Sequence, residues 1–419
     1  MLEQRDRHRA ALVSRRWLAA AHAPAVLRSV SCCGPSLVQL QSLAAWLLRH
    51  GRHVRCLELA CDPAEDVFAA CHWELGACLG VLAAAGSMQQ LKLAVRVDSV
   101  DISELHITSW CTALRQLREL ELRSIIGRLL ISSSLAGLSA VTWLWLAGDP
   151  IELGPAVQLP PNVEELRLGN IGNEEPPHQV SRLTRLASLT LTDYTCEPPA
   201  GFAVLTTLGR LARLALSHTE QLPASLPQLT GLQELVLNDA GGMLEAAAFQ
   251  SALNAALQRL TGLTSLCIVN WPARCLPPAA LAGLTRLQRC CLDANCPARN
   301  ADPPPTPLPP GPWAASLRSL GASLDVLALS TGVLSAATQL SRLAVARSSL
   351  NDIEQEAFWE WAGGHPSLQR LQIEVGAQVT VPGATVQTLT MLAQELPQLE
   401  VAIVKAGEGD LFHQEFAIE

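Results

Sequence analysis

The chain has 419 residues, of which 49% are hydrophobic and 16% are charged, and its formal net charge is −8. This composition is typical of a folded protein with a large core and excludes an intrinsically disordered chain. The uncharged apolar runs fall short of the roughly 18 residues that a membrane-spanning helix needs, and no Lys/Arg cluster marks a nucleic-acid surface. We therefore expect neither a membrane nor a nucleic acid as partner.

The cellular compartment is indicated by the N-terminus and by the cysteines. Arg15 and Arg16 interrupt the only apolar stretch near the N-terminus that could act as a secretion signal. The 13 cysteines are scattered and odd in number, which favours reduced thiols over a disulfide framework. We expect a cytoplasmic protein, with the nucleus or the cytoskeleton as alternative locations.

The first predicted element is a short helical segment within residues 1–33. Its composition favours a helix that ends near Pro24. An apolar Leu-Val pair, an Arg-Arg-Trp and then a proline, a leucine and a valine follow one another here, and this order resembles the second half of an F-box. The matching positions are Leu12, Val13, Arg16, Trp17, Pro24, Leu27 and Val30.

The resemblance implies a partner for this segment. F-box proteins bind a Skp-type adaptor through the motif and present substrates to a cullin-based ubiquitin ligase, so the matching residues would contact that adaptor. The Leu-Pro-x-Glu helix that opens the motif in the family has no counterpart after Met1. The alternatives are a gene model that starts downstream of that helix, a decayed motif, and an amphipathic helix that caps the following domain.

A short apolar pattern, LxxLxL, recurs about fourteen times between Val54 and Val404, mostly at steps of 21 to 31 residues. A single strand cannot shield three buried branched side chains, so successive copies must stack and share one core. A second phrase, LTxL, precedes many of the copies with the same period. Clear copies of the first pattern are Leu117-Leu120-Leu122, Val141-Leu144-Leu146, Val163-Leu166-Leu168 and Leu186-Leu189-Leu191.

The repeats resemble the leucine-rich-repeat family, which implies an α/β solenoid. We expect a curved horseshoe with a parallel sheet on the concave face and with helices and irregular loops on the convex face. The solenoid is predicted over residues 34–405, with helices at 242–260 and 352–363 and a tail at 406–419. Eight prolines between Cys296 and Trp313 predict a surface loop over residues 296–313.

The concave face is predicted by the alternation of side chains along a strand, because the apolar triplet faces the core and the residues between face outward. These outward residues are polar or aromatic and form the predicted partner-binding face. They are Glu119, Glu121, Arg123, Trp143, Trp145, Glu165, Arg167, Arg213, Glu234, Asn238, Arg289, Arg342 and Arg370.

Two tryptophans stand out on the predicted face. Exposed indoles are enriched among the residues that dominate protein interfaces, so Trp143 and Trp145 are candidate anchors for a partner. The alternative is that a neighbouring segment covers both rings and that they belong to the core.

The sequence contains no phosphate-binding glycine loop, nucleophile elbow or HExxH zinc motif, so we predict no catalytic residues, cofactor or metal. The nearest metal-like spacing is His50, His53, Cys56 and Cys61, for which a structural role is favoured because no CxxC pair accompanies it. We predict a non-enzymatic, monomeric protein that works within a complex. Its first interpretation is substrate recognition for a Skp/cullin/F-box ligase, and its second is a scaffold of cytoskeletal or ciliary assemblies.

Overall fold

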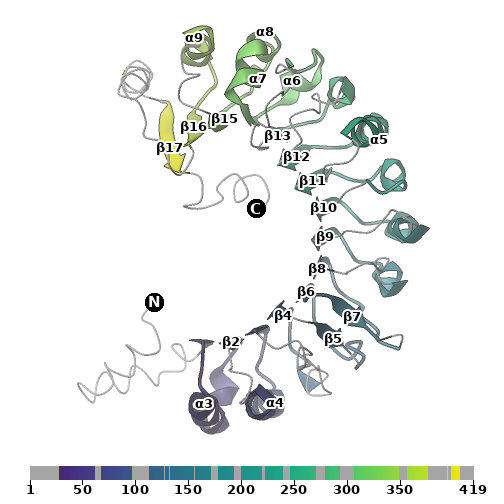
Figure 1. Cartoon of the computed structure of the whole chain (residues 1–419), viewed down its shortest axis with the longest axis vertical. Helices are drawn as coiled ribbons and strands as arrows, with labels where there is room; N and C mark the ends of the chain where they lie inside the picture. The colour runs from purple at the N-terminus through teal and green to yellow at the C-terminus, as the bar shows by residue number, and fades with distance from the viewer. Residues whose placement is uncertain are drawn as a thin grey trace. The chain divides into compact units, whose positions relative to one another are not determined.

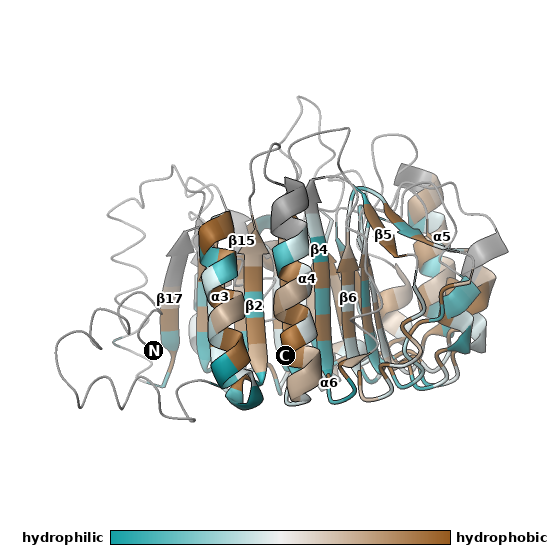
Figure 2. Ribbon diagram, turned by 90° about the horizontal axis from the view of Figure 1, so that it is seen from below, coloured by the Kyte–Doolittle hydropathy of each residue, from teal (hydrophilic) through white to brown (hydrophobic). Residues whose placement is uncertain are grey.

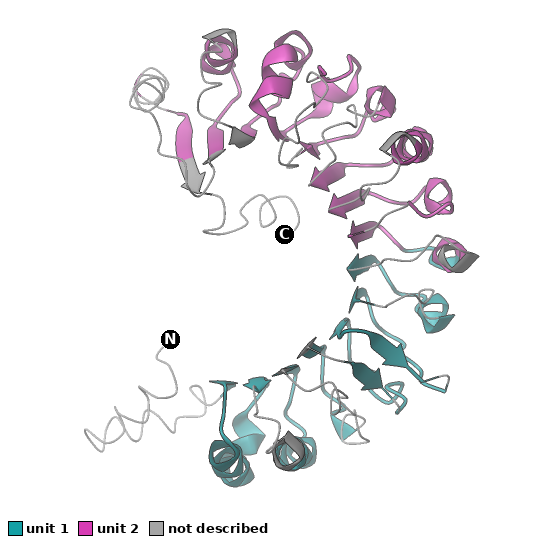
Figure 3. Ribbon diagram, in the orientation of Figure 1, with its two compact units in different colours: residues 1–196, 207–210 teal, residues 197–206, 211–419 magenta. Residues whose placement is uncertain are grey.

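The computed structural model describes residues 28–61, 68–96, 113–126, 128–131, 133–154, 156–170, 178–192, 200–218, 222–238, 246–269, 279–292, 306–348, 356–375, 394 and 398–405. The chain forms two compact units, shown in different colours in Figure 3. Unit 1 comprises residues 1–196 and 207–210, and unit 2 comprises residues 197–206 and 211–419. The two units are built from the same kind of repeat.

Unit 1 contains a main sheet of parallel strands that follow one another in chain order, and a separate pair of short strands. The main strands are β1 (Ser29–Cys33), β2 (Cys56–Cys61), β3 (Gln90–Arg96), β4 (Glu119–Ile126), β6 (Trp143–Ala147), β8 (Glu165–Gly169) and β9 (Ser188–Thr192). The separate pair is β5 (Leu129–Ile131) with β7 (Ile151–Leu153). The helices are α3 (Leu37–His50), α4 (Phe68–Ala85), and the 3-10 turns η1 (Gly51–His53) and η5 (His178–Arg182).

Unit 2 repeats this arrangement, again with parallel strands in chain order. Its strands are β10 (Arg213–Ser217), β11 (Glu234–Asn238), β12 (Ser265–Val269), β13 (Arg289–Leu292), β14 (Ser319–Ser323), β15 (Arg342–Ser348), β16 (Arg370–Val375) and β17 (Glu400–Lys405). Its α-helices are α5 (Ala246–Arg259), α6 (Trp313–Ser316), α7 (Leu324–Leu329), α8 (Thr331–Leu334) and α9 (Glu356–Gly364). The 3-10 turns are η6 (Ala200–Thr207, shared with unit 1), η7 (Leu226–Gln228) and η8 (Ala279–Gly283).

The core of each unit lies between its sheet and the helices, which pack on one face of the strands (Figure 1). The apolar residues of each repeat point into this layer: Leu144 and Leu146 of β6, for example, are fully buried. The residues between them point to the other face, which we call the open face. Along α3, hydrophobic and hydrophilic residues alternate (Figure 2). Leu40, Leu43 and Leu47 are three and four residues apart, so they share one face of the helix, and all three are buried.

The recurring LTxL phrase has a specific structural role, because it forms the turn that leads into a strand. The backbone N–H of its second leucine donates to the carbonyl of its first, over 3.0 Å for Leu186 to Leu183 and 2.9 Å for Leu232 to Leu229. All four of these leucines are buried. The phrase therefore closes a tight turn and supplies two core side chains at once.

The predicted leucine-rich-repeat solenoid is confirmed, with a parallel sheet and helices on its other side. The sheet begins earlier than residue 34, because β1 pairs in register with β2 and Val30 is only 5% exposed. The resemblance assigned Val30 to an adaptor, but the structure gives it a place in the sheet. The strand reads Ser-Val-Ser-Cys-Cys and lacks the leucine triplet, so the repeat pattern did not reveal it.

Helix α3 explains why this first coil is well formed despite its irregular strand. Ser36 caps the helix, since its hydroxyl accepts from the N–H of Gln39 and the Gln39 side chain accepts from the N–H of Ser36. Such a reciprocal capping box satisfies two backbone donors at the helix start.

The described part of the proline-rich stretch is a loop with exposed prolines at Pro307, Pro310 and Pro312, and two side chains anchor it in the core. Leu308 and Trp313 are buried, and the Trp313 indole N–H donates to the carbonyl of Pro309 over 2.9 Å. The apolar area of an indole outweighs the tendency of the flanking prolines to lie at the surface. Residues 296–305 lie outside the described part of the chain.

The predicted helices are present as α5 and α9, and residues 242–245 and 352–355 lie outside the described part of the chain. The predicted tail, residues 406–419, and the residues of the F-box-like segment before Val30 lie outside the described residues. None of the helices in the described ranges is long and apolar enough to cross a membrane.

We expect the substitution Leu144→Ala to lower the free energy of unfolding by about 2–5 kcal/mol, because Leu144 is fully buried in β6 and its truncation leaves a cavity. The matched control is Leu48→Ala, since Leu48 on α3 is 73% exposed and its loss should change stability by about 0.5 kcal/mol or less. Urea unfolding followed by circular dichroism measures both. Equal losses would contradict the assignment of the core.

Candidate functional site

The predicted tryptophans lie on the open face of unit 1, on a strand between two charged strands. The parallel register places Trp143 beside Glu119 of β4 and Glu165 of β8. Both rings are half-buried, whereas Leu144 between them is fully buried on the core side. The alternation of the strand therefore separates an aromatic surface from the aliphatic core.

The two indoles contact each other edge to face. Their ring centroids are 6.2 Å apart and their planes are at 86°, a geometry that the quadrupoles of aromatic rings favour. The pair forms a rigid apolar surface, because neither ring can turn far without losing this contact.

Two arginines flank Trp145 from the neighbouring strands. The guanidinium of Arg123 lies 4.6 Å from the ring centroid of Trp145, and that of Arg167 lies 5.9 Å from the same centroid. Arg167 is also 5.6 Å from the centroid of Trp143. Cation–π contacts of this kind stabilise by about 0.5–1 kcal/mol each at exposed sites.

Carboxylates hold both arginines in place. Glu165 bonds to Arg167 at 2.7 Å and 2.8 Å through two nitrogens of the guanidinium, and Glu121 lies 3.6 Å from Arg123. Glu121 is only 7% exposed and is also 3.9 Å from Lys92, so two cations compensate its buried charge. We call the set of Glu121, Arg123, Trp143, Trp145, Glu165 and Arg167 the aromatic site.

The aromatic site provides apolar surface, cations and anions in alternation, which is suited to recognition of another molecule. Its carboxylates are each paired with a cation, so none is presented as a general acid or base. In the described part of the chain, no group of three histidines, cysteines or acidic residues is arranged to hold a metal ion. The spacing of His50, His53, Cys56 and Cys61 thus yields no metal site there.

Of the other predicted face residues, Glu119 is on β4 of unit 1. The rest belong to unit 2 and occupy the first outward position of its strands or, for Asn238, the third. Arg213 and Glu234 are register partners, with 3.6 Å between the nitrogen and the carboxylate oxygen, and Arg370 lies 3.9 Å from Glu400. Arg289 and Arg342 occupy the same row on β13 and β15. The predicted face residues are thus carried by strands of both units.

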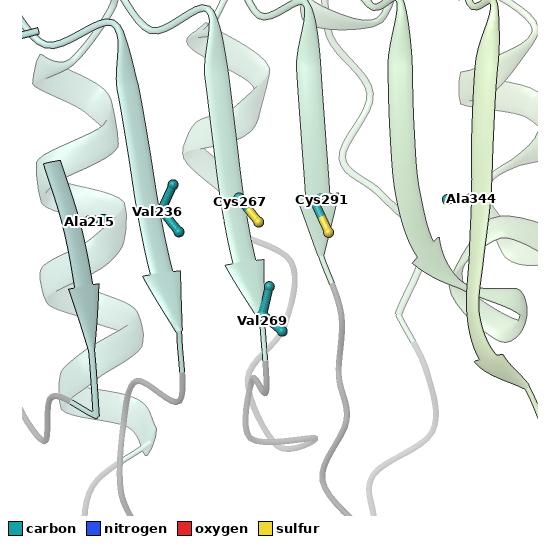
Figure 4. Close-up of a cluster of buried hydrophobic side chains, with 6 residues drawn as sticks. All are labelled: Ala215, Val236, Cys267, Val269, Cys291 and Ala344. Atoms are coloured by element: carbon teal, nitrogen blue, oxygen red, sulfur yellow. The ribbon is translucent and has the colours of Figure 1, made fainter. Parts of the chain in front are cut away.

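The sequence analysis missed an apolar feature of the open face of unit 2. At the middle position of the strands, small apolar residues replace the charged and aromatic ones of unit 1, and Figure 4 shows them on the face opposite the helices. The signal was present in the sequence, since the residue between the second and third members of the triplet is Ala, Val or Cys in these repeats. We call this cluster the apolar strip. Ala215, Val236, Cys267, Cys291 and Ala344 occupy the middle position, and Val269 lies two residues further along β12.

No protein-family model matches the sequence, and no curated protein matches it. An internalin from Listeria monocytogenes is similar in structure, with 13% identity, a TM-score of 0.40, and coverage of 93% of this chain and 88% of the internalin. A leucine-rich-repeat protein from Leptospira interrogans has 15% identity and a TM-score of 0.39, covering 92% of this chain and 98% of its own.

A third similar structure is a complex of PEPR1 with AtPEP1, with 15% identity and a TM-score of 0.33. The similarity covers 80% of this chain and 45% of the other. Identities and scores at this level give no information on what this chain binds.

We expect the double substitution Trp143→Ala/Trp145→Ala to lower the free energy of unfolding by only about 1–2 kcal/mol, because the rings are half-buried and their contacts with the arginines are weak. A core tryptophan truncated to alanine would cost about 3–5 kcal/mol. Urea unfolding beside Leu144→Ala separates the two cases, and a loss as large as that of the core variant would place the rings in the core.

Proposed function

We propose that this chain is a non-catalytic protein-binding scaffold and that the aromatic site of unit 1 captures a protein partner. The observation that carries this proposal is the pair of half-buried tryptophans on the open face, flanked by Arg123 and Arg167. Tryptophan and arginine are the residue types most enriched among those that dominate binding energy at protein interfaces.

The rigidity of the aromatic site supports the proposal. The edge-to-face contact restrains the two rings, and the ion pairs of Glu121 and Glu165 restrain the two arginines. Side chains that are ordered before binding lose less entropy when a partner arrives. A partner therefore meets a surface that is already in its binding conformation.

The charges around the site favour a protein over a polyanion. Glu121 and Glu165 lie beside Arg123 and Arg167, so positive and negative groups alternate across the rings. Nucleic acid requires a surface of one sign, because its binding energy comes largely from contacts with phosphates. Mixed charges fit a protein surface with complementary mixed charges.

The dimensions of the open face of unit 1 set an upper limit on the area that a partner contacts at the aromatic site. The seven main strands of unit 1 span roughly 29 Å at the usual strand spacing, and five residues along a strand span about 16 Å. The resulting area is smaller than the about 800 Å² that each side of a standard interface buries. We infer that the partner inserts a single loop or segment here.

The partner is tested by affinity purification of the full chain from its native cells, followed by quantitative mass spectrometry. Proteins bound through the aromatic site should decrease about thirtyfold with Trp143→Ala/Trp145→Ala, which corresponds to the about 2 kcal/mol typical of a dominant interface residue. The control is Trp73→Ala, because Trp73 lies on α4 and is 82% exposed. Recovery of the same proteins with wild type and double variant would refute the proposal.

A finer proposal concerns the N-terminal segment, which resembles the second half of an F-box at residues that include Leu12, Trp17 and Leu27. On this proposal the chain recruits substrates to a Skp/cullin ligase. Its support is the order of the motif residues in the sequence, followed by a leucine-rich-repeat solenoid. The alternative is a scaffold of cytoskeletal or ciliary assemblies with no role in ubiquitination.

We predict that a purified Skp-type adaptor binds the full chain and that Trp17→Ala removes this binding, as measured by titration calorimetry. Failure of the wild-type chain to bind would end the ligase proposal and leave capture at the aromatic site intact. A deletion for the same purpose must stop at residue 27, because β1 starts at Ser29 and belongs to the sheet. Co-sedimentation with microtubules that survives this deletion would favour the alternative.

A further inference from the structure

The apolar strip of unit 2 is buried although it lies on the face opposite the helices (Figure 4). Cys267 is 1% exposed and Cys291 is 0% exposed, and the two are register partners on β12 and β13. At the same position of the repeat in unit 1, Lys92 and Trp145 are half-buried, whereas Glu121 between them is 7% exposed and is paired with Lys92 and Arg123. The strip is therefore as buried as the residues of an interface, although none of the described helices covers it.

Positive charge borders the strip along the first outward position of the strands. Within the described part of the chain, Arg289 and Arg342 form no ion pair, and Arg289 has Ser265 and Ser319 as its register partners. Arginine side chains beside apolar surface favour an occupant that carries carboxylates next to apolar groups.

A buried amide marks the end of the strip. Gln372, at the middle position of β16, is 4% exposed, and its Oε1 accepts no hydrogen bond among the described residues. A buried acceptor without a donor destabilises the folded chain. The backbone N–H of an extended segment is a donor that would satisfy it.

Residues 406–419 have the composition that this surface requires. They contain four carboxylates, at Glu408, Asp410, Glu415 and Glu419, and no lysine or arginine. They also contain four large apolar side chains, which are Leu411, Phe412, Phe416 and Ile418. In an extended segment Phe412, Phe416 and Ile418 would share one side and Glu415 and Glu419 the other.

The segment is also long enough. It follows β17 directly, and β17 is separated from β12 by five strand spacings, or roughly 24 Å. Its fourteen residues reach up to about 46–50 Å when extended. The far end of the strip, at β10, is roughly 34 Å from β17 and is within reach too.

We propose that residues 406–419 bind within the same molecule along the apolar strip, with their apolar side chains over Cys267 and Cys291 and their carboxylates beside Arg289 and Arg342. The open face of unit 2 is then occupied by the chain's own C-terminal segment. This proposal does not depend on partner capture at the aromatic site.

Alkylation of the thiols tests the proposal, because four cysteines of the full chain report on three environments: the strip, the core and the exposed surface. Cys267 and Cys291 should react with iodoacetamide about tenfold faster after truncation at Lys405, a factor that corresponds to about 1.4 kcal/mol of segment binding. Cys290, next to Cys291 but in the core, should stay protected, since burial raises the pKa of its thiol far above the usual range. Cys33 is exposed and should react in both forms.

Two further variants keep the test decisive if the truncated chain fails to fold. In the full chain, Phe412→Ser/Phe416→Ser should expose Cys267 and Cys291, and so should Arg289→Glu/Arg342→Glu. Adding Glu415→Arg/Glu419→Arg to the arginine variant should restore protection, because it reverses both partners of the charge contact. A peptide of residues 406–419 should bind the truncated chain and not the intact one.

Three results would overturn the proposal. The first is reaction of Cys267 and Cys291 in the intact chain at the rate of Cys33. The second is continued protection of both thiols in a folded truncated chain. The third is protection that disappears on dilution together with a dimer in light scattering, which would assign the segment to a second copy.

Discussion

The burial of apolar side chains that no single repeat can shield is the constraint on which the rest of the structure depends. Each coil contributes a short strand whose leucines, such as Leu120 and Leu122 on β4, are covered only when the next strand lies beside them. The LTxL turn adds two more leucines to the same layer. The strands are therefore held in parallel register within each unit. This register determines which side chains are neighbours on the open face.

The open face follows from this register, because a residue that does not enter the core is placed beside its equivalents in adjacent repeats. In unit 1 this brings Trp145 between Arg123 and Arg167, and the ion pairs of the two arginines hold them against the rings. In unit 2 the same position collects small apolar residues, of which Cys267 and Cys291 are neighbours. Identical backbones thus carry two surfaces with different chemistry.

On our proposals, the aromatic site of unit 1 and the apolar strip of unit 2 have different functions. A half-buried aromatic pair among alternating charges is suited to a partner that comes and goes, because its polar border remains hydrated when the site is empty. A continuous apolar strip is a liability in water unless something covers it. The composition of residues 406–419 offers such a cover from the same chain, and it leaves the aromatic site available for other proteins.

The sequence by itself determined the class of fold, because the LxxLxL period is local and each triplet must be buried. The sequence also determined which residues of each strand face outward, because side chains alternate between the two faces of a strand. Only the tertiary structure decided which of them meet, as for Trp145 with Arg123 and Arg167. It also revealed β1 and the buried Trp313, which have no periodic signal, because their burial depends on neighbours distant in the chain. The apolar strip was likewise revealed only by the tertiary structure, because its small residues form a continuous surface only when parallel strands align them.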